Sequence, residues 1–288
     1  MRVPRAEANT AVDDCAIHYF TWGNPEHPPL VFVHGRMSHA RCWAFIAPLL
    51  AHRFYCVALD LSGMGDSGHR DRYSYATRAS EVSDVLTAAG VDRPATLVTH
   101  SYGAVVGLRA IHDHPYQFRG LIACDPNLSH PDEWVNERPR TDGPELSRPH
   151  RVYPDLETAL SRFRLAPPQD SIEPALERYI ALHCLEQVEN GWQWKFDPYV
   201  YSSHEEGHND WWVTHSRDFT ELECPKAIIY GRESVFASDE IVRAICDRSP
   251  TPIPSAGIAE AHHHIMIDQP IAMAASIEAM AEALNVLG

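Results

Sequence analysis

The sequence is poor in positive charge, long apolar runs and paired cysteines. Lys and Arg number 24 against 39 Asp and Glu, so the formal net charge is -15. This balance argues against a nucleic-acid partner, because phosphate binding needs a basic face. It argues equally against an anionic membrane surface. No stretch of about 18 apolar residues occurs, and the first residues lack the apolar core of a signal peptide.

The seven cysteines are scattered and suggest neither a disulfide framework nor a zinc site. An odd number of unpaired thiols suits a reducing compartment. We therefore expect a cytoplasmic protein that has no metal and no cofactor. Its expected partner is a small-molecule substrate, with no nucleic acid and no membrane; the choice between a monomer and a homodimer stays open.

Short β-rich apolar runs alternate with helical patterns along most of the chain. The runs read as buried strands because they are apolar on both faces, which is typical of a parallel sheet covered by helices. Segments 79–90 and 276–287 carry apolar residues at helical spacing, and segment 13–23 predicts an antiparallel edge strand. The five predicted buried strands are 30–35, 54–60, 95–101, 120–125 and 226–231.

This alternation breaks between about residues 127 and 223. Prolines recur there and exclude long helices from much of the stretch, although segments such as "LETALSRF" keep helical spacing. The sequence therefore predicts an α/β fold with a mostly parallel central sheet flanked by helices. Residues 1–126 and 224–288 form its core, and 127–223 form an inserted, mostly helical cap.

The segment "THSYG" (99–103) places a serine between an apolar run and a helical pattern. A nucleophile at a sharp strand-to-helix turn needs small neighbours, which Gly103 provides. The alternative is that Ser101 is only a helix N-cap. Thr99 departs from the usual small residue at its position and crowds the turn.

Three further segments favour the nucleophile. "HG" (34–35) ends a strand, and its glycine lets the amide of Arg36 turn inward; with the amide of Tyr102 it would bind a developing oxyanion. "DLSGMGDS" (60–67) is a glycine-rich loop in which the aspartates fix turns. "AHHHIMIDQP" (261–270) supplies histidines before a helix.

In this order, these segments resemble the α/β-hydrolase fold superfamily over nearly the whole chain outside the insertion. The resemblance implies a nucleophile, an acid and a histidine in chain order, with a cap inserted after the sixth strand. The family's histidine typically stands seven places before the proline of a "DQP"-like stretch, which gives His263 as the base. His262 and His264 are its close competitors.

The acid is harder to assign. Many relatives carry it after the seventh strand, three places beyond a glycine, but Ser234 stands there and cannot serve as an anion. A subset holds it after the sixth strand, where Asp125 directly follows an apolar run. We favour Asp125 as the carboxylate that orients the histidine. Glu233 and Asp239 remain alternatives.

Other residues are weighed as pocket candidates. The side chain of Arg36 either binds a substrate carboxylate, points to solvent or pairs with Asp66. Three consecutive histidines cannot all face one ion, which argues against a metal there. The four substrate-pocket candidates are His34, His100, Trp211 and Trp212.

The resulting prediction is a serine hydrolase that cleaves an ester, thioester or lactone of a small, apolar or aromatic substrate. Ser101 would form the acyl-enzyme, with His263 as base and Asp125 as its partner. A serine nucleophile disfavours the dehalogenase and epoxide-hydrolase branches, which need a carboxylate. The alternatives are a carbon–carbon bond hydrolase acting on a ring-cleavage product, and a small-molecule receptor that keeps the fold.

Overall fold

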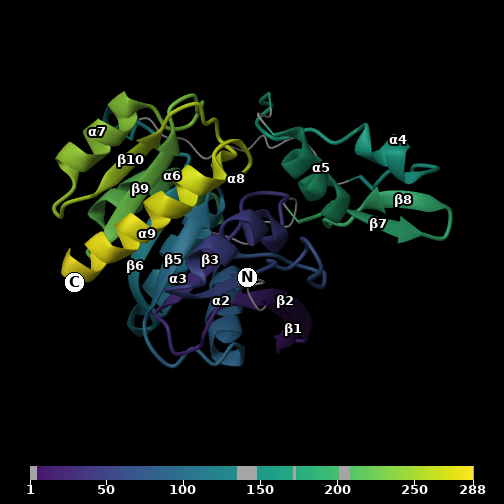
Figure 1. The fold of residues 1–288 in the computed structure, drawn as a ribbon, viewed down its shortest axis with the longest axis horizontal. Coiled ribbons are helices and arrows are strands. Elements are labelled where there is room, and N and C mark those ends of the chain that lie inside the picture. Colours follow the sequence, from purple (N-terminus) through teal and green to yellow (C-terminus); the bar gives the residue numbers. More distant parts are fainter. Residues whose placement is uncertain (1–4, 135–147, 171–172, 201–207, 288) are drawn as a thin grey trace.

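A computed structural model describes residues 5–134, 148–170, 173–200 and 208–287. They form an eight-stranded sheet that is parallel except at the N-terminal side (Figure 1). In spatial order its strands are β1 (Arg5–Val12), β2 (Cys15–Trp22), β4 (Tyr55–Leu59), β3 (Pro29–Val33), β5 (Ala95–His100), β6 (Phe118–Cys124), β9 (Lys226–Gly231) and β10 (Ser255–Ile258).

The strand order determines where the site lies. Successive strands are added on opposite sides of β3, with β4 on one side and β5 on the other. The connections leave a crevice at such a switch point, beyond the carboxyl ends of the strands. The loop after β3 and the turn after β5 meet there, and these are the segments that the sequence singled out.

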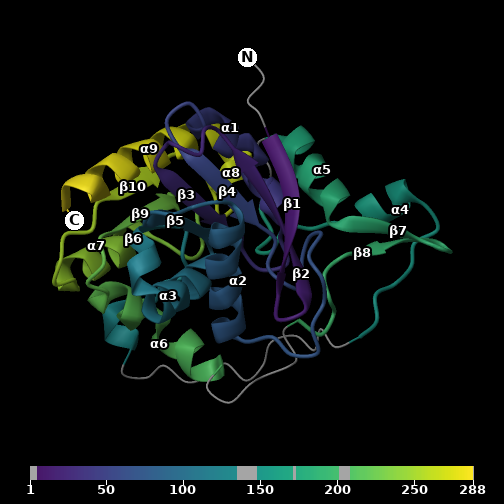
Figure 2. The same cartoon turned by 90° about the horizontal axis from the view of Figure 1, so that it is seen from below.

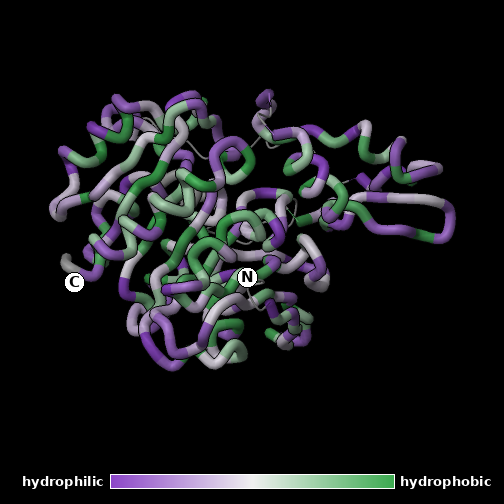
Figure 3. Tube along the Cα trace, viewed as in Figure 1, coloured by the Kyte–Doolittle hydropathy of each residue, from purple (hydrophilic) through white to green (hydrophobic). Residues whose placement is uncertain are grey.

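Helices cover both faces of the sheet, as the view in Figure 2 shows. One apolar cluster lies under α2 (Tyr75–Ala88), α3 (Gly103–Asp113), α6 (His208–Glu221) and α7 (Asp239–Arg248). The other lies under η1 (Ala40–Phe45), α1 (Ala47–Leu50), α8 (Ile265–Asp268) and α9 (Pro270–Leu287). A short η2 (Pro115–Gln117) precedes β6. Hydrophobic residues run through the central strands, and hydrophilic ones gather towards the periphery (Figure 3).

Helix α2 illustrates how local sequence sets an element. Ser74 precedes it in an extended conformation, and its Oγ accepts a hydrogen bond from the Thr77 amide at 3.0 Å. This contact satisfies one of the amides that a helix start leaves without a partner. The buried Val82 and Leu86 then face the sheet.

Segment 13–23 does contain an antiparallel strand, but the prediction that this strand lies at the edge of the sheet was wrong. That segment is β2, which pairs with β4 inside the sheet, and the edge is β1. Most side chains of β1 are exposed, and the strand contains three alanines. It therefore has neither the apolar run nor the β-branched composition by which strands are predicted.

The chain between β6 and β9 contains η3 (Pro131–Glu133), α4 (Leu156–Leu160), α5 (Pro174–His183), the hairpin of β7 (Leu185–Val188) and β8 (Gly191–Trp194), and α6. We call residues 127–223 the insertion. Helices α4 and α5 and the hairpin lie beside the core, whereas α6 packs on α3 (Figure 1). The predicted cap boundaries at 127 and 223 stay a prediction.

All seven cysteines are free thiols, and five of them are buried. They lie in the core on both faces of the sheet, for example Cys15 on one face and Cys56 on the other. Among the helices of the described residues, none is long and apolar enough to cross a membrane.

Candidate active site

Ser101 lies at the sharp turn between β5 and α3 with a φ of 51°, in the left-handed region that non-glycine residues rarely adopt. Its amide donates to the carbonyl of Cys124 at 3.1 Å, which ties the turn to β6. Gly103 is required by space, because a Cβ there would lie 2.6 Å from the Val33 carbonyl oxygen. The strained serine and the close approach of the next strand are the marks of a nucleophile turn.

The unusual Thr99 is accommodated by a glycine on the facing helix. A Cβ at Gly107 would lie 2.9 Å from Cγ2 of Thr99, so the threonine methyl occupies space that a side chain on α3 would otherwise take. The β-branched side chain also suits the end of a strand. The crowding that the sequence predicts at Thr99 is thus relieved by Gly107, one turn after the start of α3.

The structure brings Asp125 and His263 together. Nδ1 of His263 lies 3.1 Å from Oδ1 of Asp125, and both side chains are buried. Since a carboxylate only accepts, Nδ1 carries the proton and Nε2 is left as the basic nitrogen. Asp125 also has a positive φ, of 45°, at the end of β6. Asp125 and Ser101 therefore lie at the ends of adjacent strands, both in the left-handed region.

Ser234 has a role that the sequence did not suggest. Its Oγ donates to Oδ1 of Asp125 at 2.7 Å, and the amide of Gly231 donates to Oδ2 at 2.9 Å. The position at which many relatives place the acid thus holds a hydroxyl that binds the acid from the neighbouring strand. A serine three places after a strand-end glycine was the available signal.

The alternative acids lie elsewhere. The side chain of Glu233 is exposed, and the Asp239 carboxylate accepts a hydrogen bond from the Tyr230 hydroxyl at 2.6 Å. Of the two competing histidines, His262 binds Asp268 and His264 binds Gln169, each through Nδ1. Among these candidates, the structure pairs only His263 and Asp125.

Ser101 and His263 line one small pocket with about 30 Å³ of free space, enough for about one water molecule. Residues from the loop after β3, from η1, from the loop that contains His263 and from the insertion complete its wall. The described hydrogen bonds do not include one between Ser101 and His263, a contact that often tightens only when substrate is bound. The remaining lining residues are Gly35, Arg36, Ser38, Cys42, His100, Ala166, Ile180, His264, Met266 and Ile267.

Two neutral histidines flank His263 in this pocket. His100 donates from Nε2 to the His263 carbonyl at 2.9 Å, and burial is the main cause that holds its pKa well below the usual value. Burial, together with the nearby His263, lowers the pKa of His264 to about 3. Both rings pack within 5.0 Å of the His263 ring, measured between centroids. They therefore surround His263 without adding positive charge at neutral pH.

The two residues predicted to supply oxyanion amides both lie near Ser101. Arg36 follows Gly35 at the pocket wall, and Tyr102 is the residue from which α3 begins. A helix start carries partial positive charge, which suits an anion. The exposed Arg36 side chain is not the partner of Asp66, whose oxygens bind Arg41 and Lys195.

His34, predicted as a pocket residue, is part of the backbone scaffold. Its Nδ1 donates to the Gly35 carbonyl at 2.7 Å, and its Nε2 accepts from the Leu61 amide at 3.0 Å. Burial lowers its pKa to about 4. His34 is not among the residues that line the small pocket with Ser101, and its role as a pocket residue stays a prediction. Trp211 and Trp212 fall in α6, and their side chains lie outside the described residues.

The model of the alpha/beta hydrolase family matches residues 30–276, a span that includes Ser101, Asp125 and His263. The chain belongs to the alpha/beta hydrolase family. The resemblance drawn from the sequence motifs is thereby confirmed, as is the mostly parallel sheet flanked by helices.

Curated relatives of this alpha/beta hydrolase match shorter segments. Epoxide hydrolase 1 of Caenorhabditis elegans is 30% identical over 112 residues, 38% of this chain and 28% of that protein. A serine hydrolase-like protein of Homo sapiens is 34% identical over 110 residues, 37% of this chain and 54% of that protein. Fluoroacetate dehalogenase of Burkholderia sp is 35% identical over 34% of each chain. The matched segment spans between 28% and 54% of these relatives.

Solved structures match the fold along nearly the whole chain. The thioesterase domain from the curacin biosynthetic pathway has a TM-score of 0.76 at 23% identity and covers 96% of this chain and 99% of that one. E-2-(acetamidomethylene)succinate hydrolase has a TM-score of 0.75 at 18% identity, over 97% and 100%. An esterase from Mycobacterium tuberculosis has a TM-score of 0.72 at 20% identity and covers 98% of this chain and 92% of that one. At these identities the likeness shows the fold alone.

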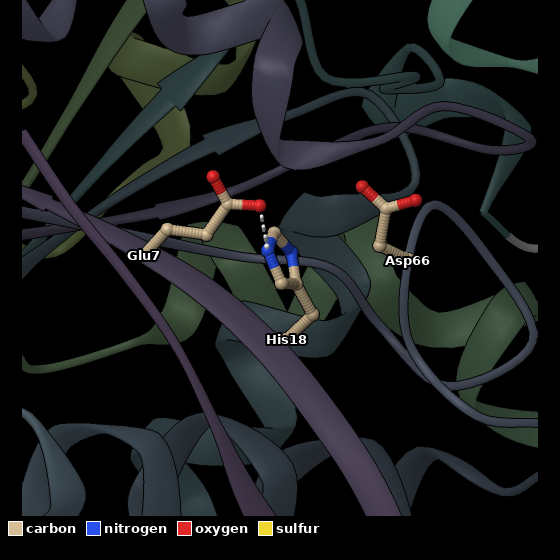
Figure 4. Close-up of side chains that lie close together, drawn as sticks. All are labelled: Glu7, His18 and Asp66. Carbon is tan, nitrogen blue, oxygen red and sulfur yellow. Dashed lines mark hydrogen bonds and ion pairs between the residues drawn. The ribbon is translucent and has the colours of Figure 1, made fainter.

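One group of side chains in the described part of this hydrolase has the geometry of metal ligands. Glu7, His18 and Asp66 place one ligand atom each within 4.8 Å of one another (Figure 4). Arg41 already binds both carboxylates, Lys195 binds Asp66, and Nδ1 of His18 binds Asp60 at 2.8 Å. A metal ion would have to displace two cations, so we interpret the group as an ion-pair network.

Asp60 fixes the glycine-rich loop, as the sequence predicts. Its carboxylate accepts from the amides of Ala40 and Asp66, at 2.5 and 3.0 Å, and from His18. Burial raises the pKa of Asp60, but the hydrogen bond from His18 and the nearby histidines outweigh this and lower it to about 2. A Cβ at Gly65 would lie 2.3 Å from this carboxylate. Asp60 is therefore a turn residue and lies outside the pocket wall.

Proposed function

We propose that this alpha/beta hydrolase cleaves esters, thioesters or lactones of small acids through an acyl-enzyme at Ser101. The observation that carries the proposal is the left-handed Ser101 at a strand-to-helix turn, in a pocket shared with the His263 that binds Asp125. A backbone in this conformation is strained, and such strain is typical of functional positions.

In the proposed reaction, Nε2 of His263 takes the proton of the Ser101 hydroxyl while Oγ attacks the substrate carbonyl carbon. The carbonyl π electrons move to oxygen, and the amides of Arg36 and Tyr102 stabilise this oxyanion. Collapse of the intermediate breaks the bond to the alcohol or thiol, which leaves with the proton from His263. Water then attacks the acyl group with the same histidine as base, and releases the acid and free Ser101.

Asp125 fits the role of the orienting carboxylate. It fixes the His263 tautomer with the proton on Nδ1 and stabilises the imidazolium that forms when Nε2 accepts the serine proton. Ser234 and Gly231 hold the carboxylate in place through separate oxygens. Because both oxygens have donors in a buried site, the carboxylate is kept in one rotamer facing the histidine.

The size of the pocket supports short acyl groups. Its free space is about 30 Å³, and Ala166 and Ile180 of the insertion cover it. A short acyl chain needs less movement of these side chains than a long one. We therefore expect acetyl and propionyl esters to be better substrates than long-chain esters.

The rival functions are less well supported. Carbon–carbon bond hydrolases of this fold typically carry the acid after the seventh strand of the sheet, which corresponds to β9, where this chain has Ser234. The names of two relatives refer to epoxides and to fluoroacetate, but such chemistry needs a carboxylate at the position of Ser101. A receptor that does not hydrolyse its ligand would leave the Ser101–His263–Asp125 arrangement without a use.

The test combines labelling and turnover. We expect a fluorophosphonate to label the folded protein at Ser101 and nitrophenyl acetate to be hydrolysed, because both reagents need an activated serine. Ser101→Ala should lose both activities, whereas Ser161→Ala, at an exposed serine of the insertion, should keep both. Hydrolysis of a dienoic ketone but of no ester would favour the carbon–carbon alternative, and folded wild type without label would reject Ser101 as nucleophile.

A further inference from the structure

Gln169 is a residue of the insertion that reaches the loop containing His263. Its Oε1 accepts from the His264 amide at 3.0 Å and from Nδ1 of His264 at 2.9 Å. Its Nε2 donates to the two carboxylate oxygens of Asp268 at 3.1 and 3.0 Å. The side chain is half-buried. One amide thus makes four contacts with residues on the C-terminal side of His263.

Asp268 holds the same loop on its N-terminal side. Oδ2 of this carboxylate accepts from the His262 amide at 2.7 Å and from Nδ1 of His262 at 3.1 Å. Its side chain is fully buried. The residues before and after His263 are therefore held by a single connected pair, Asp268 and Gln169. His263 itself has its carbonyl bound by His100.

Only a side-chain amide at position 169 can satisfy both of its partners, Asp268 and His264. Because Asp268 accepts and His264 donates, the side chain between them needs one NH₂ group and one carbonyl oxygen. Glutamine has both, glutamate has only the acceptor at neutral pH, and methionine has neither. Substitution by glutamate therefore removes the NH₂ donor alone, and substitution by methionine removes both the donor and the acceptor.

The segment that carries Gln169 also lines the pocket. Ala166, three residues earlier, lies in the wall, as does Ile180 of α5. The carbonyl of Ile180 accepts a hydrogen bond from Nε2 of His39, at 3.0 Å, which ties α5 to the core on the other side of the pocket. The position of the insertion and the position of the base are thus physically connected.

We propose that Gln169 is a positioning residue, which holds His263 in line with Ser101 when the insertion is seated over the pocket. The inference rests on the proposed function. It makes the insertion part of the catalytic arrangement, because unseating it removes two hydrogen bonds from His264, next to the base, and two from Asp268 of α8. A shift of about 1 Å in a catalytic group costs on the order of 100-fold in rate.

The variants are Gln169→Met, Gln169→Glu and the matched control Gln187→Met at an exposed glutamine of β7. We expect Gln169→Met to lower kcat for nitrophenyl acetate about 10- to 100-fold with a smaller change in KM, and the control to match wild type. Thermal unfolding of each variant separates this loss from misfolding.

Gln169→Glu adds a pH readout that a merely structural role would not give. The carboxylate that this substitution introduces and the carboxylate of Asp268 repel each other at pH 8, whereas at pH 6 they can share one proton. The shared proton replaces the missing NH₂ donor. The rate of Gln169→Glu relative to wild type should therefore rise about 10-fold from pH 8 to pH 6, while that of Gln169→Met stays constant.

Hydrogen exchange of the amides of 262–266 gives a readout independent of turnover. Gln169→Met should accelerate it and Gln187→Met should not. Wild-type kcat in Gln169→Met, or a relative rate of Gln169→Glu that does not change with pH, overturns the positioning role. A folded wild type that is neither labelled nor active would reject the proposed reaction, and with it the positioning role of Gln169. Faster exchange in Gln169→Met would in that case show only that Gln169 stabilises the loop.

Discussion

At the scale of single residues, Ser101 combines a reactive position with an unfavourable backbone conformation. A left-handed φ costs a non-glycine residue roughly 1–2 kcal/mol, and glycine avoids that cost but loses more entropy on folding. We expect Ser101→Gly to abolish ester turnover and to raise the free energy of unfolding by up to about 1 kcal/mol. Urea denaturation measures the change, with Ser101→Ala as control because it keeps the Cβ. A less stable glycine variant would contradict this account.

Asp125 gives a second prediction at this scale. Asp125→Asn keeps the shape but removes the charge that stabilises the imidazolium, so we expect kcat to fall about 100- to 10,000-fold. Glu233→Gln, at an exposed carboxylate, should leave kcat unchanged. Steady-state rates with nitrophenyl acetate decide the matter. The assignment would be reversed by a fall in Glu233→Gln alone.

The chemistry-bearing residues of the candidate site could be proposed from sequence, but the residues that hold them could not. Ser101, Asp125 and His263 each follow a strand or precede a helix in a recognisable pattern. Ser234 contacts Asp125, 109 positions away, and Gln169 contacts His264 and Asp268, 95 and 99 positions away. No local pattern indicates such contacts. The contact between His34 and Leu61 was missed for the same reason, since Leu61 belongs to another loop.

At the scale of secondary-structure elements, the packing of β5 on α3 depends on the pair Thr99 and Gly107. Adding a methyl at position 107 places a Cβ 2.9 Å from Thr99 Cγ2, which is too close for a packed core. We expect Gly107→Ala to destabilise the protein by about 1–3 kcal/mol.

Removing the opposing methyl should restore much of this loss. The double variant Thr99→Ser with Gly107→Ala is expected to be more stable than Gly107→Ala alone, with a coupling energy of about 0.5–3 kcal/mol in a double-mutant cycle. Denaturant midpoints of the four proteins measure it. Strictly additive effects would show that the two residues do not share this space.

Strands and helices with a clear apolar pattern could be predicted from the sequence, and those without one could not. The five buried parallel strands are continuous apolar runs, so their positions along the chain were clear, whereas the sixth parallel strand, the partly exposed β10, was not among them. Strand β1 is mostly exposed, and β8 has the sequence "GWQW", with aromatic residues that are only half-buried. Both depend on pairing with a neighbouring strand, which a single-sequence pattern does not contain.

At the scale of the whole molecule, buried neutral histidines make stability depend on pH. His34 and His264 have pKa values lowered to about 4 and about 3, and His100 is lowered as well, each chiefly by burial. In the unfolded chain they titrate near 6.5, so below that pH the unfolded state binds more protons. The unfolding free energy should therefore fall as the pH drops from 6.5 to 4.

Each such histidine contributes up to about 1.4 kcal/mol per pH unit in that window. His18 opposes the trend. Burial lowers its pKa, but its hydrogen bonds to the carboxylates of Asp60 and Glu7 outweigh this and raise it, so His18 adds stability below pH 6.5. Burial also lowers the pKa of His39 and His183, so five histidines outweigh His18, and we expect a net loss of stability. Urea midpoints at pH 7.5, 6 and 5 test it; a midpoint that is constant or rises towards pH 5 would contradict it.

The buried free cysteines make it possible to detect unfolding of the core by thiol alkylation. Five of the seven are buried, and burial raises the pKa of each of these, that of Cys184 to about 12. Only a thiolate reacts with an alkylating reagent. These thiols therefore do not react while the helices pack on the sheet, and they become reactive when the helices separate from it. Each alkylated core thiol then marks a molecule that has opened, so the chain reports its unfolding without an added probe.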